Sequence, residues 1–574
     1  MIKKLLSGLC VFGSCLGTAR AQNTYLQLGE DEYHLLDRLE TKSGKLSGKL
    51  FLSTKPVTRA ATVSFLEDRL DEANNELSGI SLNKVDRYNM YHAIAISSEW
   101  RKVQSGENEI AVLRAKPWFG TFYKTGADFV YVNTKDFFLS VNPVISAQYM
   151  SEQSKSGGVS SNQGLFASSR GAEIRARIAD KIGLYTYFAD NQEQPPTYVT
   201  QWITRHSAVP GADYYQNSPG SKTYDYIQAR GYIDFAAIKN YVNVTFGYDK
   251  QFLGDGIRSL FLSDFAASST FLKLNTKIWK LNYQNIYAEI IPPYVRGADR
   301  NLPLKYTTTH YLTVNATKWL NVGLFESIVF SKNSYSFGYL NPIIFYRAIE
   351  RFYGSPDNVN LGFSLKVIPL KGVQLYSQLF LDEFKSKELF GSNKWWGNKY
   401  GLQLGAKYFD AFTVRNLDLQ GEFNLVRPYT YSHSDSVTNY SHYNQPLAHP
   451  LGSGFREIIV VANYRPVQRL SLTGKLMYYK QGVDTGGLNY GNDIFRSYNS
   501  VVNQYGVTVI NGLAATCKLA SFNASYKIAE RLFFDLGFIY RNYQYQNNYY
   551  PQQQSLSIYG GMRLNIARRT YDFM

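Results

Sequence analysis

One stretch of the sequence concentrates residue types that could do chemistry. Arg427 to Gly452 reads RPYTYSHSDSVTNYSHYNQPLAHPLG and is bracketed by prolines. Such a stretch could hold a metal ion, catalyse a reaction or bind a ligand, and each possibility demands a different spacing. Its ring-bearing candidates are His433, His442, His449, Tyr429, Tyr431, Tyr440 and Tyr443.

The spacing argues against metal binding and catalysis. Zinc requires about three or four converging His, Cys or carboxylate ligands. The three histidines are nine and seven residues apart, and only Asp435 accompanies them. The stretch contains no G-x-S-x-G or comparable nucleophile motif, which a hydrolase would need. We predict that the chain is not an enzyme and uses no metal ion or cofactor.

Sugar binding suits the same residues better. Sugars present flat C–H faces and a rim of hydroxyls, so their sites combine aromatic rings with planar polar groups. The four tyrosines, the histidines and the amides of Asn439, Asn444 and Gln445 supply that mixture. Arg427 could add a bidentate contact to an acidic sugar. The alternative, that these residues only fold the loop, stays open.

The first residues predict export. Lys3 and Lys4, a short apolar core and the A-x-A site at 19–21 form a signal peptide over 1–21. Phe12 to Cys15 is a weaker lipobox match, so a lipoprotein is the alternative. Cys517 is the single cysteine outside the predicted signal peptide, which excludes an intramolecular disulfide in the mature chain.

The charge of the chain favours anionic partners. The net charge is +16, or +13 without Lys3, Lys4 and Arg20 of the signal. A basic exported protein suggests acidic polysaccharide or the phosphates of lipopolysaccharide. Nucleic acid is not expected, because the chain shows no recognisable nucleic-acid-binding motif.

The composition is typical of a membrane barrel. The chain has 47 Tyr and 35 Phe, yet its mean hydropathy is only −0.29. No apolar run beyond the signal approaches the roughly 18 residues that a spanning helix requires. Transmembrane β-barrels combine aromatic richness with alternation, whereas a secreted array of β-sandwiches is the competing class.

Alternation with a period of two decides between these classes. In NLDLQGEFNL (416–425), leucines and Phe423 fall on one face, and Asp418, Gln420 and Glu422 fall on the other. The same period recurs at 532–540 and 556–566, and it indicates strands. We place about eighteen strands between residues 136 and 566, which makes residues 118–574 an antiparallel transmembrane barrel.

Short turns alternate strictly with long loops along the predicted barrel. Turns such as 317–319 and 529–531 are only a few residues long. Outer-membrane barrels place short turns on the periplasmic side and long loops outside. The predicted outer loops, which include the opening stretch, are 151–163, 192–223, 250–268, 292–306, 331–360, 385–397, 427–453, 482–517 and 547–553.

Residues 22–117 differ from the rest in pattern. Helical spacing is found at 33–39, 62–70 and 88–100, and Asp86 is a candidate N-cap for the last segment. We predict a small, mainly helical region that plugs the periplasmic end of the barrel. In the lumen, Glu173, Arg175 and Arg177 are expected to face inward together with Asp418 and Glu422.

Two outer loops carry further candidates. In 331–360, Asn341 as N-cap, Pro342 and Gly354 predict a short helix buried against the barrel mouth. Arg347 and Arg351 lie one turn apart on it and could meet an anionic polymer, or they could pair with loop acids. Trp395 and Trp396 are either sugar platforms or members of the aromatic girdle, and the girdle is favoured.

Four segments resemble the Wzi family of capsule assembly proteins. They are EYHLLDRLETKSG with FLSTKPVTRA, GYDKQFLGDGIRSLFLSDFA (247–266), LNPIIFYRAIERFYGSPDN (340–358) and HYNQPLAHPLG (442–452). The similarity covers nearly the whole mature chain and is greater to the branch found in gliding bacteria, which includes the motility protein RemB. It implies an outer-membrane barrel closed by a periplasmic helical bundle, with a lectin role toward capsular polysaccharide. The outer loops differ from that family, so the sugar cannot be carried over.

The expected function is therefore retention of capsular or exopolysaccharide at the cell surface. The expected partners are an acidic surface polysaccharide and outer-membrane lipid with its lipopolysaccharide. A scaffold for gliding motility or adhesin export, with the loops docking motility or export proteins, is the alternative. A diffusion porin is a third reading.

Overall fold

The computed structural model describes most of the chain beyond the signal peptide. The predicted signal (1–21) and residues 102–117 of the predicted helical region lie outside the described residues. The described ranges are 24–74, 82–101, 120–179, 181–218, 220–238, 241–295, 302–331, 335–343, 345–354, 357–383, 386–389 and 393–573.

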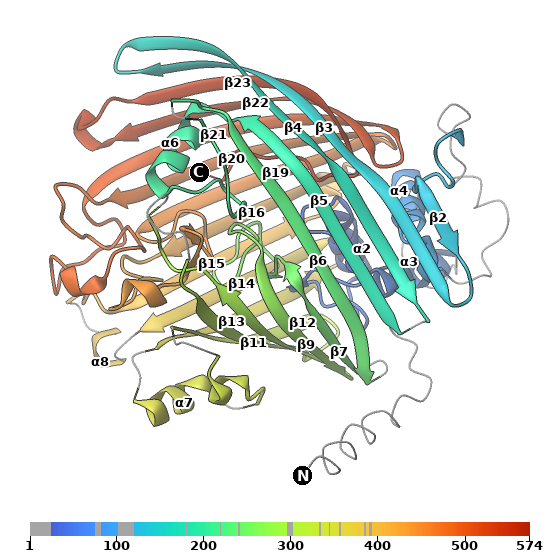
Figure 1. Cartoon of the computed structure of the whole chain (residues 1–574), viewed down its shortest axis with the longest axis horizontal. Helices are drawn as coiled ribbons and strands as arrows, with labels where there is room; N and C mark the ends of the chain where they lie inside the picture. The colour runs from blue at the N-terminus through green and yellow to red at the C-terminus, as the bar shows by residue number, and fades with distance from the viewer. Residues whose placement is uncertain are drawn as a thin grey trace.

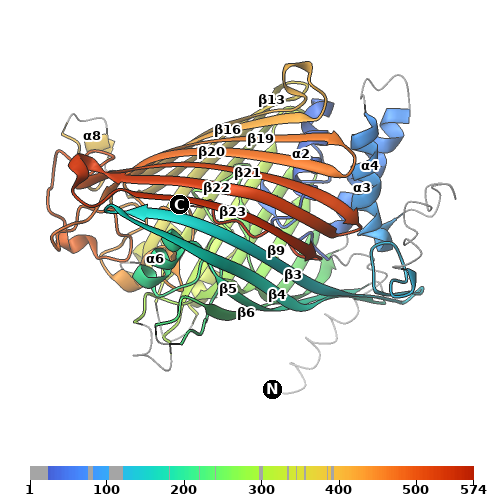
Figure 2. The same ribbon diagram turned by 90° about the horizontal axis from the view of Figure 1, so that it is seen from above.

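The chain forms a closed antiparallel barrel of eighteen strands (Figures 1 and 2). The last strand, β23, pairs with the first, β3, and this pairing closes the barrel. This confirms the predicted fold. The strands are β3 Phe137–Ser156, β4 Val159–Ile178, β5 Ile182–Gln194, β6 Tyr224–Ile238, β7 Val242–Asp249, β9 Ser269–Ile278, β10 Leu281–Ile290, β11 Lys305–Asn315, β12 Leu320–Phe330, β13 Asn358–Leu370, β14 Val373–Glu383, β15 Lys399–Tyr408, β16 Leu417–Val426, β19 Phe455–Val467, β20 Leu470–Val483, β21 Leu513–Ala529, β22 Leu532–Tyr545 and β23 Gln553–Leu564.

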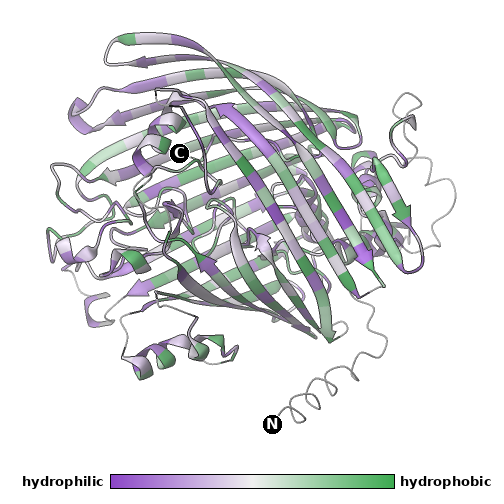
Figure 3. Ribbon diagram, viewed as in Figure 1, coloured by the Kyte–Doolittle hydropathy of each residue, from purple (hydrophilic) through white to green (hydrophobic). Residues whose placement is uncertain are grey.

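The two faces of each strand differ as the alternation predicts. Leu324, Leu476 and Leu536 point outward and are more than half exposed. Asp418 and Glu422 are buried inside the barrel. Figure 3 shows the same alternation of hydrophobic and hydrophilic residues along the strands. An apolar exterior around a polar interior is the pattern of a barrel that lies in lipid. None of the described helices is long and apolar enough to cross a membrane.

The first hairpin departs from the predicted boundaries. Residues 151–163 were expected to be an outer loop, but β3 and β4 continue through them to a tight turn. Gly157 and Gly158 occupy this turn with φ of 57° and 84°, a conformation that costs glycine little. Residues 151–163 are mostly polar, so their strand conformation depends on pairing rather than on an apolar face. A four-residue strand, β2 (Val130–Asn133), pairs with β3 at the other end.

A helical plug closes the end of the barrel opposite the long loops (Figures 1 and 2). Its elements are α2 (Glu32–Ser43), α3 (Arg59–Asn74), α4 (Lys84–Ala95) and the short η2 (Ser98–Trp100). They share a core of their own that includes Leu36, Leu66 and Met90. Asn83, and not Asp86, caps α4; Asp86 is the third residue of the helix and completes a capping box.

Ion pairs fasten the plug to the inner wall. Arg38 pairs with Asp86 of the plug and with Asp410 and Asp418 of the barrel. Lys366 and Lys407 of the wall reach Glu40 and Asp37, both at 2.6 Å. Burial alone would raise the pKa of Asp37, but Lys407 and Lys366 lower it to about 2. The Asp37 carboxylate therefore stays charged at neutral pH.

Two outer loops and the C-terminal tail also fill the lumen. The loops 250–268 and 427–453 were predicted to face outside, but they fold back between the strands. β8 (Phe252–Leu253) pairs with β1 (Thr54–Lys55) of the plug, and Phe261 stacks on Phe325 of the wall at 4.5 Å. The residues after β23 also enter, because Tyr571 donates to Glu193 at 2.6 Å. Their apolar rings are buried inside the barrel instead of meeting water.

Candidate functional site

The structure buries most ring-bearing candidates of the 427–453 loop. Tyr431 and Tyr440 stack at 5.9 Å and are almost fully inaccessible. Their hydroxyls donate to the backbone carbonyls of Leu260 and Phe261. These two rings therefore hold the in-folded loops together and are not available as sugar platforms. Tyr443 remains half-buried.

The histidines of this loop are structural. His442 accepts from the Ile291 amide at 2.9 Å through Nδ1, and its Nε2 lies 2.9 Å from the Ser268 carbonyl oxygen. His433 bonds to Thr438, and His449 bonds to Glu457. In the described residues no group of three or more His, Cys, Asp or Glu side chains is arranged to hold a metal ion.

Acid is expected to release this loop. Burial lowers the pKa of His442 to about 3 and that of His433 to about 4, whereas both would titrate near 6.5 in a released loop. The closed loop binds fewer protons than the released loop. The free energy that keeps the loop closed is therefore at its full value above pH 6.5 and decreases as the pH falls toward 4. Each pH unit in that window favours opening by up to about tenfold per histidine.

Hydrogen exchange of residues 430–445 at pH 7 and pH 4.5, corrected for intrinsic rates, measures this release. The His442→Gln variant does not titrate at that position and should show a weaker pH dependence. Equal protection at both pH values would contradict the expectation.

Tyr429 of the loop packs with aromatic residues of two other outer loops. We call Trp395, Trp396, Tyr429 and Tyr498 the tryptophan cluster. Trp396 lies 5.4 Å from Tyr429 and 5.2 Å from Tyr498, between ring centroids. Arg427 donates to the Trp395 carbonyl at 3.1 Å. The indole Nε1 of Trp396 donates to Gln504, so this ring packs against outer loops. The favoured girdle position is therefore wrong for Trp396.

The helix of the 331–360 segment is shorter than predicted and lies elsewhere. It is α7 (Tyr346–Tyr353), preceded by Phe345 and ended by Gly354. Asn341 does not cap it, and Ile343 is 85% exposed instead of buried. Arg347 pairs with Glu350 at 2.6 Å, and Arg351 is exposed.

An open cleft of about 750 Å³ lies at the loop-covered end. One side is α6 (Thr197–His206), which begins where Pro195 and Pro196 end the strand β5. The Glu152 carboxylate accepts from both the amide and the hydroxyl of Thr197 and so fixes the start of the helix. The helix faces the cleft with the residues Tyr198, Gln201, Trp202, Arg205 and His206.

Aromatic rings line this cleft, and one arginine packs between two of them. The Trp202 and His206 rings stack at 4.2 Å, and burial lowers the pKa of His206 to about 4, which leaves it neutral. The Arg541 guanidinium lies 4.8 Å from the Tyr198 ring and 4.7 Å from the Tyr543 ring. The remaining wall is formed by Tyr479, Tyr545, Tyr550, Gln481, Gln553, Asn444, Asp484, Asn492, Asp493 and Phe495, among others.

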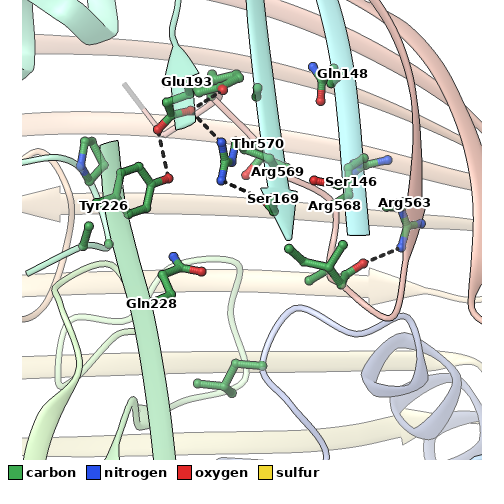
Figure 4. A pocket seen from close by; sticks show the side chains of 18 of the residues that line it. Ser146, Gln148, Ser169, Glu193, Tyr226, Gln228, Arg563, Arg568, Arg569 and Thr570 are labelled. Carbon is green, nitrogen blue, oxygen red and sulfur yellow. Dashed lines mark hydrogen bonds and ion pairs between the residues drawn. The ribbon is translucent and has the colours of Figure 1, made fainter. Parts of the chain in front are cut away.

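A second, smaller cavity of about 260 Å³ lies within the lumen, beside the C-terminal tail (Figure 4). Arg569 pairs with Glu193 at 2.9 Å, and Arg563 pairs with Asp535 at 2.8 Å. Tyr226 also donates to Glu193. Because this cavity is small for a polymer and is enclosed within the lumen, the outer cleft is the better candidate site.

Comparison with solved structures identifies the fold. The chain is similar to Wzi, an outer membrane protein involved in group 1 capsule assembly in Escherichia coli and a carbohydrate-binding β-barrel. The TM-score is 0.53 at 12% identity, over 96% of this chain and 100% of that one. The chain has the Wzi fold. This confirms the predicted resemblance at the level of structure, and the relation to gliding bacteria stays a prediction.

Weaker similarities extend to other outer-membrane barrels. OprD of Pseudomonas aeruginosa matches with a TM-score of 0.39 and OccK9 (OpdG) with 0.40, each at 10% identity. Both cover 74% of this chain, and 95% and 98% of their own lengths. No family model matches the sequence, and no curated protein is similar to it in sequence.

Within this Wzi fold, sequence reasoning missed the cleft. Of the residues that the sequence predicted for sugar binding, only Asn444 lies among the described residues that line it. One signal was available: TYVTQWITRH after two prolines has helical spacing that places Tyr198, Trp202 and Arg205 together. The strand residues Arg541 and Tyr543 gave no such signal, because inward-facing tyrosine and arginine are ordinary in a polar lumen.

Proposed function

We propose that this chain is an outer-membrane barrel that binds surface polysaccharide in the cleft between α6 and the inner wall of β20 and β22. The single observation that supports this function is an open, ring-lined cleft above a filled lumen. The plug, the in-folded loops and the C-terminal tail occupy the interior, so the chain is built to hold a ligand at its surface rather than to pass it.

The lining residues supply both parts of sugar recognition. Aromatic faces such as those of Tyr545 and Tyr550 offer stacking surfaces for C–H faces. Gln201, Gln553 and Asn492 offer amides for hydroxyl groups. Weak contacts repeated along a polymer give strong retention through multivalency, and no covalent step is required.

We also propose that the bound polysaccharide is acidic. Arg205 and Arg541 in the cleft are matched by Asp484 and Asp493, so the cleft alone does not select an acidic polymer. The preference for an acidic polysaccharide rests on the net positive charge of the chain, which is +16. If it holds, binding should weaken as salt rises.

Removing rings from the cleft is expected to weaken polysaccharide binding. Each of Tyr545→Ala and Tyr550→Ala should reduce affinity about fivefold, which corresponds to the roughly 1 kcal/mol of one ring contact. The measurement is sedimentation or surface binding of purified surface polysaccharide to the detergent-solubilised barrel. Tyr214→Ala is the matched control, because Tyr214 is 65% exposed at the same end but lies outside the cleft. Equal loss in all three variants, or no binding by the parent, would contradict the proposal.

A further inference from the structure

Two ionisable side chains stand on the face of the wall that should meet lipid. His310 of β11 and Glu326 of β12 are register partners. Their neighbours on the same face are the pair Leu312 and Leu324, and Leu324 is 52% exposed. A charged residue on the lipid face of a barrel is destabilising in a depth-dependent way. Yet His310 is only 6% and Glu326 only 5% exposed.

The segment between β12 and β13 covers both residues from outside. We call its described residues, 335–343 and 345–354, the strap. The amides of Tyr346 and Arg347 donate to Glu326 at 2.8 and 3.4 Å, and the Tyr346 hydroxyl bonds to His310. Figure 1 shows α7 outside the barrel, not over its mouth. The strap thus shields polar wall residues that lipid would not tolerate.

Further contacts pin the strap along the wall. Tyr287 and Tyr283 of β10 donate to the carbonyls of Leu340 and Pro342, at 3.0 and 2.5 Å. Tyr339 and Tyr346 are fully buried against Phe330 and Ile328. Because β10, β11 and β12 all contribute, the strap is a fixed part of the fold and not a free loop.

The surface that the strap turns away from the wall is strongly apolar. Phe337 is 88% exposed, Ile343 85%, Phe345 71% and Phe352 82%. Such a patch is unusual on a water-exposed surface. It continues the lipid-facing surface formed by Leu324 and the neighbouring outward residues of β13, Leu361 and Phe363. Lipid is therefore the occupant that the position of the patch favours.

Two arginines accompany the apolar patch. The Arg347 side chain is 70% exposed, and it pairs with Glu350. Arg351 is exposed and has no ion pair among the described residues. Guanidinium groups bind phosphate through paired N–H donors, and aromatic with basic residues is the composition of interfacial membrane helices.

We propose that the strap binds outer-leaflet lipid. Its phenylalanines lie among the acyl chains, and Arg347 and Arg351 bind the phosphates of a phosphorylated glycolipid of the lipid A type. The outer leaflet follows from the chain path, since the strap joins β12 to β13 at the end opposite the plug. The proposal requires that the barrel lies in a membrane, but it does not depend on polysaccharide binding.

Spin-label accessibility in nanodiscs tests the position of the strap. The barrel carrying Phe352→Cys is labelled with a nitroxide and placed in phosphatidylcholine nanodiscs, with Cys517 buried in the wall. The label at 352 should be relaxed by oxygen and shielded from a water-soluble nickel chelate. The matched label at Tyr214→Cys should show the reverse. A label at 352 that is open to nickel would overturn the proposal and favour a protein-docking surface.

Glu326→Leu provides a variant that should fold yet lose the strap. Leucine suits the lipid face, but it removes the acceptor of the Tyr346 and Arg347 amides. Added to the labelled protein, it should raise nickel accessibility at 352 severalfold. Unchanged accessibility would mean that Glu326 does not hold the strap.

Lipid retention tests the arginines. In nanodiscs that contain phosphatidylcholine and lipid A, the lipid A bound to the purified barrel is counted by native mass spectrometry. Arg347→Gln and Arg351→Gln should each lower it, by up to about fivefold, and Arg415→Gln should not, because Arg415 is exposed at the plug end. Equal retention in all variants would overturn the phosphate contact. Polysaccharide binding should be unchanged throughout, which separates this test from that of the proposed function.

Discussion

Replacing Arg38 by alanine is expected to loosen the plug by about 3 kcal/mol. The Arg38 side chain is 5% exposed. Its three guanidinium nitrogens each pair with a different carboxylate, that of Asp86, Asp410 or Asp418. Removing one partner of a buried ion pair leaves uncompensated charge and costs about 3–5 kcal/mol. The lower value applies because Lys42 still reaches Asp86 and Asp410, both at 2.9 Å.

Native-state hydrogen exchange of α2 and α4, compared with that of the strands, measures this effect. Arg38→Lys should recover only part of the loss, because an ammonium group cannot donate along three directions of a planar fork. Lys49→Gln is the control, since its pair with Asp68 is solvent-exposed and such pairs contribute about 0–1 kcal/mol. Unaltered exchange in Arg38→Ala would show that the core contacts alone hold the plug.

The second large effect is expected at Tyr431. Its ring is fully buried between Tyr440 and Phe380, so Tyr431→Ala leaves a cavity and should destabilise the in-folded loops by about 3–5 kcal/mol. Tyr431→Phe removes only the hydrogen bond to Leu260 and should cost about 1 kcal/mol. Alanine is preferred to glycine because Tyr431 has φ of 73°, and glycine would relieve that backbone strain.

Protease cleavage within 427–453 and single-channel current report this change. Tyr431→Ala should become cleavable and should show transient openings that the parent lacks, because the loop fills the lumen. Tyr443→Ala is the matched control within the loop, since Tyr443 is half-buried and also has a positive φ, of 49°. A Tyr431→Ala barrel as resistant and as silent as the parent would contradict the proposed packing.

Much of the fold could be predicted from the sequence, because strands and helices are indicated by the spacing of apolar residues that are neighbours in the chain. In Leu417–Val426 the alternation of leucine with Asp418 and Glu422 fixes both the strand and its two faces, since a barrel wall separates lipid from a polar interior. The helical spacing of the plug is equally local. The strand continuation through 151–163 was missed, because paired polar residues have no apolar period to reveal them.

The candidate site was harder to predict because loop sequences do not say which way a loop turns. Tyr429, Tyr431 and Tyr440 suit a sugar site and suit a packed interior equally well. Only the tertiary structure shows that Leu260 and Phe261 receive the hydroxyls of Tyr431 and Tyr440, and that α6 stands over Arg541 to form the cleft.

By itself, the sequence determined that this chain is an eighteen-stranded barrel with a helical plug, because two-residue and helical periods are properties of neighbouring residues. The tertiary structure alone decided which loops enter the lumen, where a cleft remains open and that one segment wraps the outer wall. These features depend on contacts between residues far apart in the chain, such as Tyr346 with Glu326, and no local pattern encodes them.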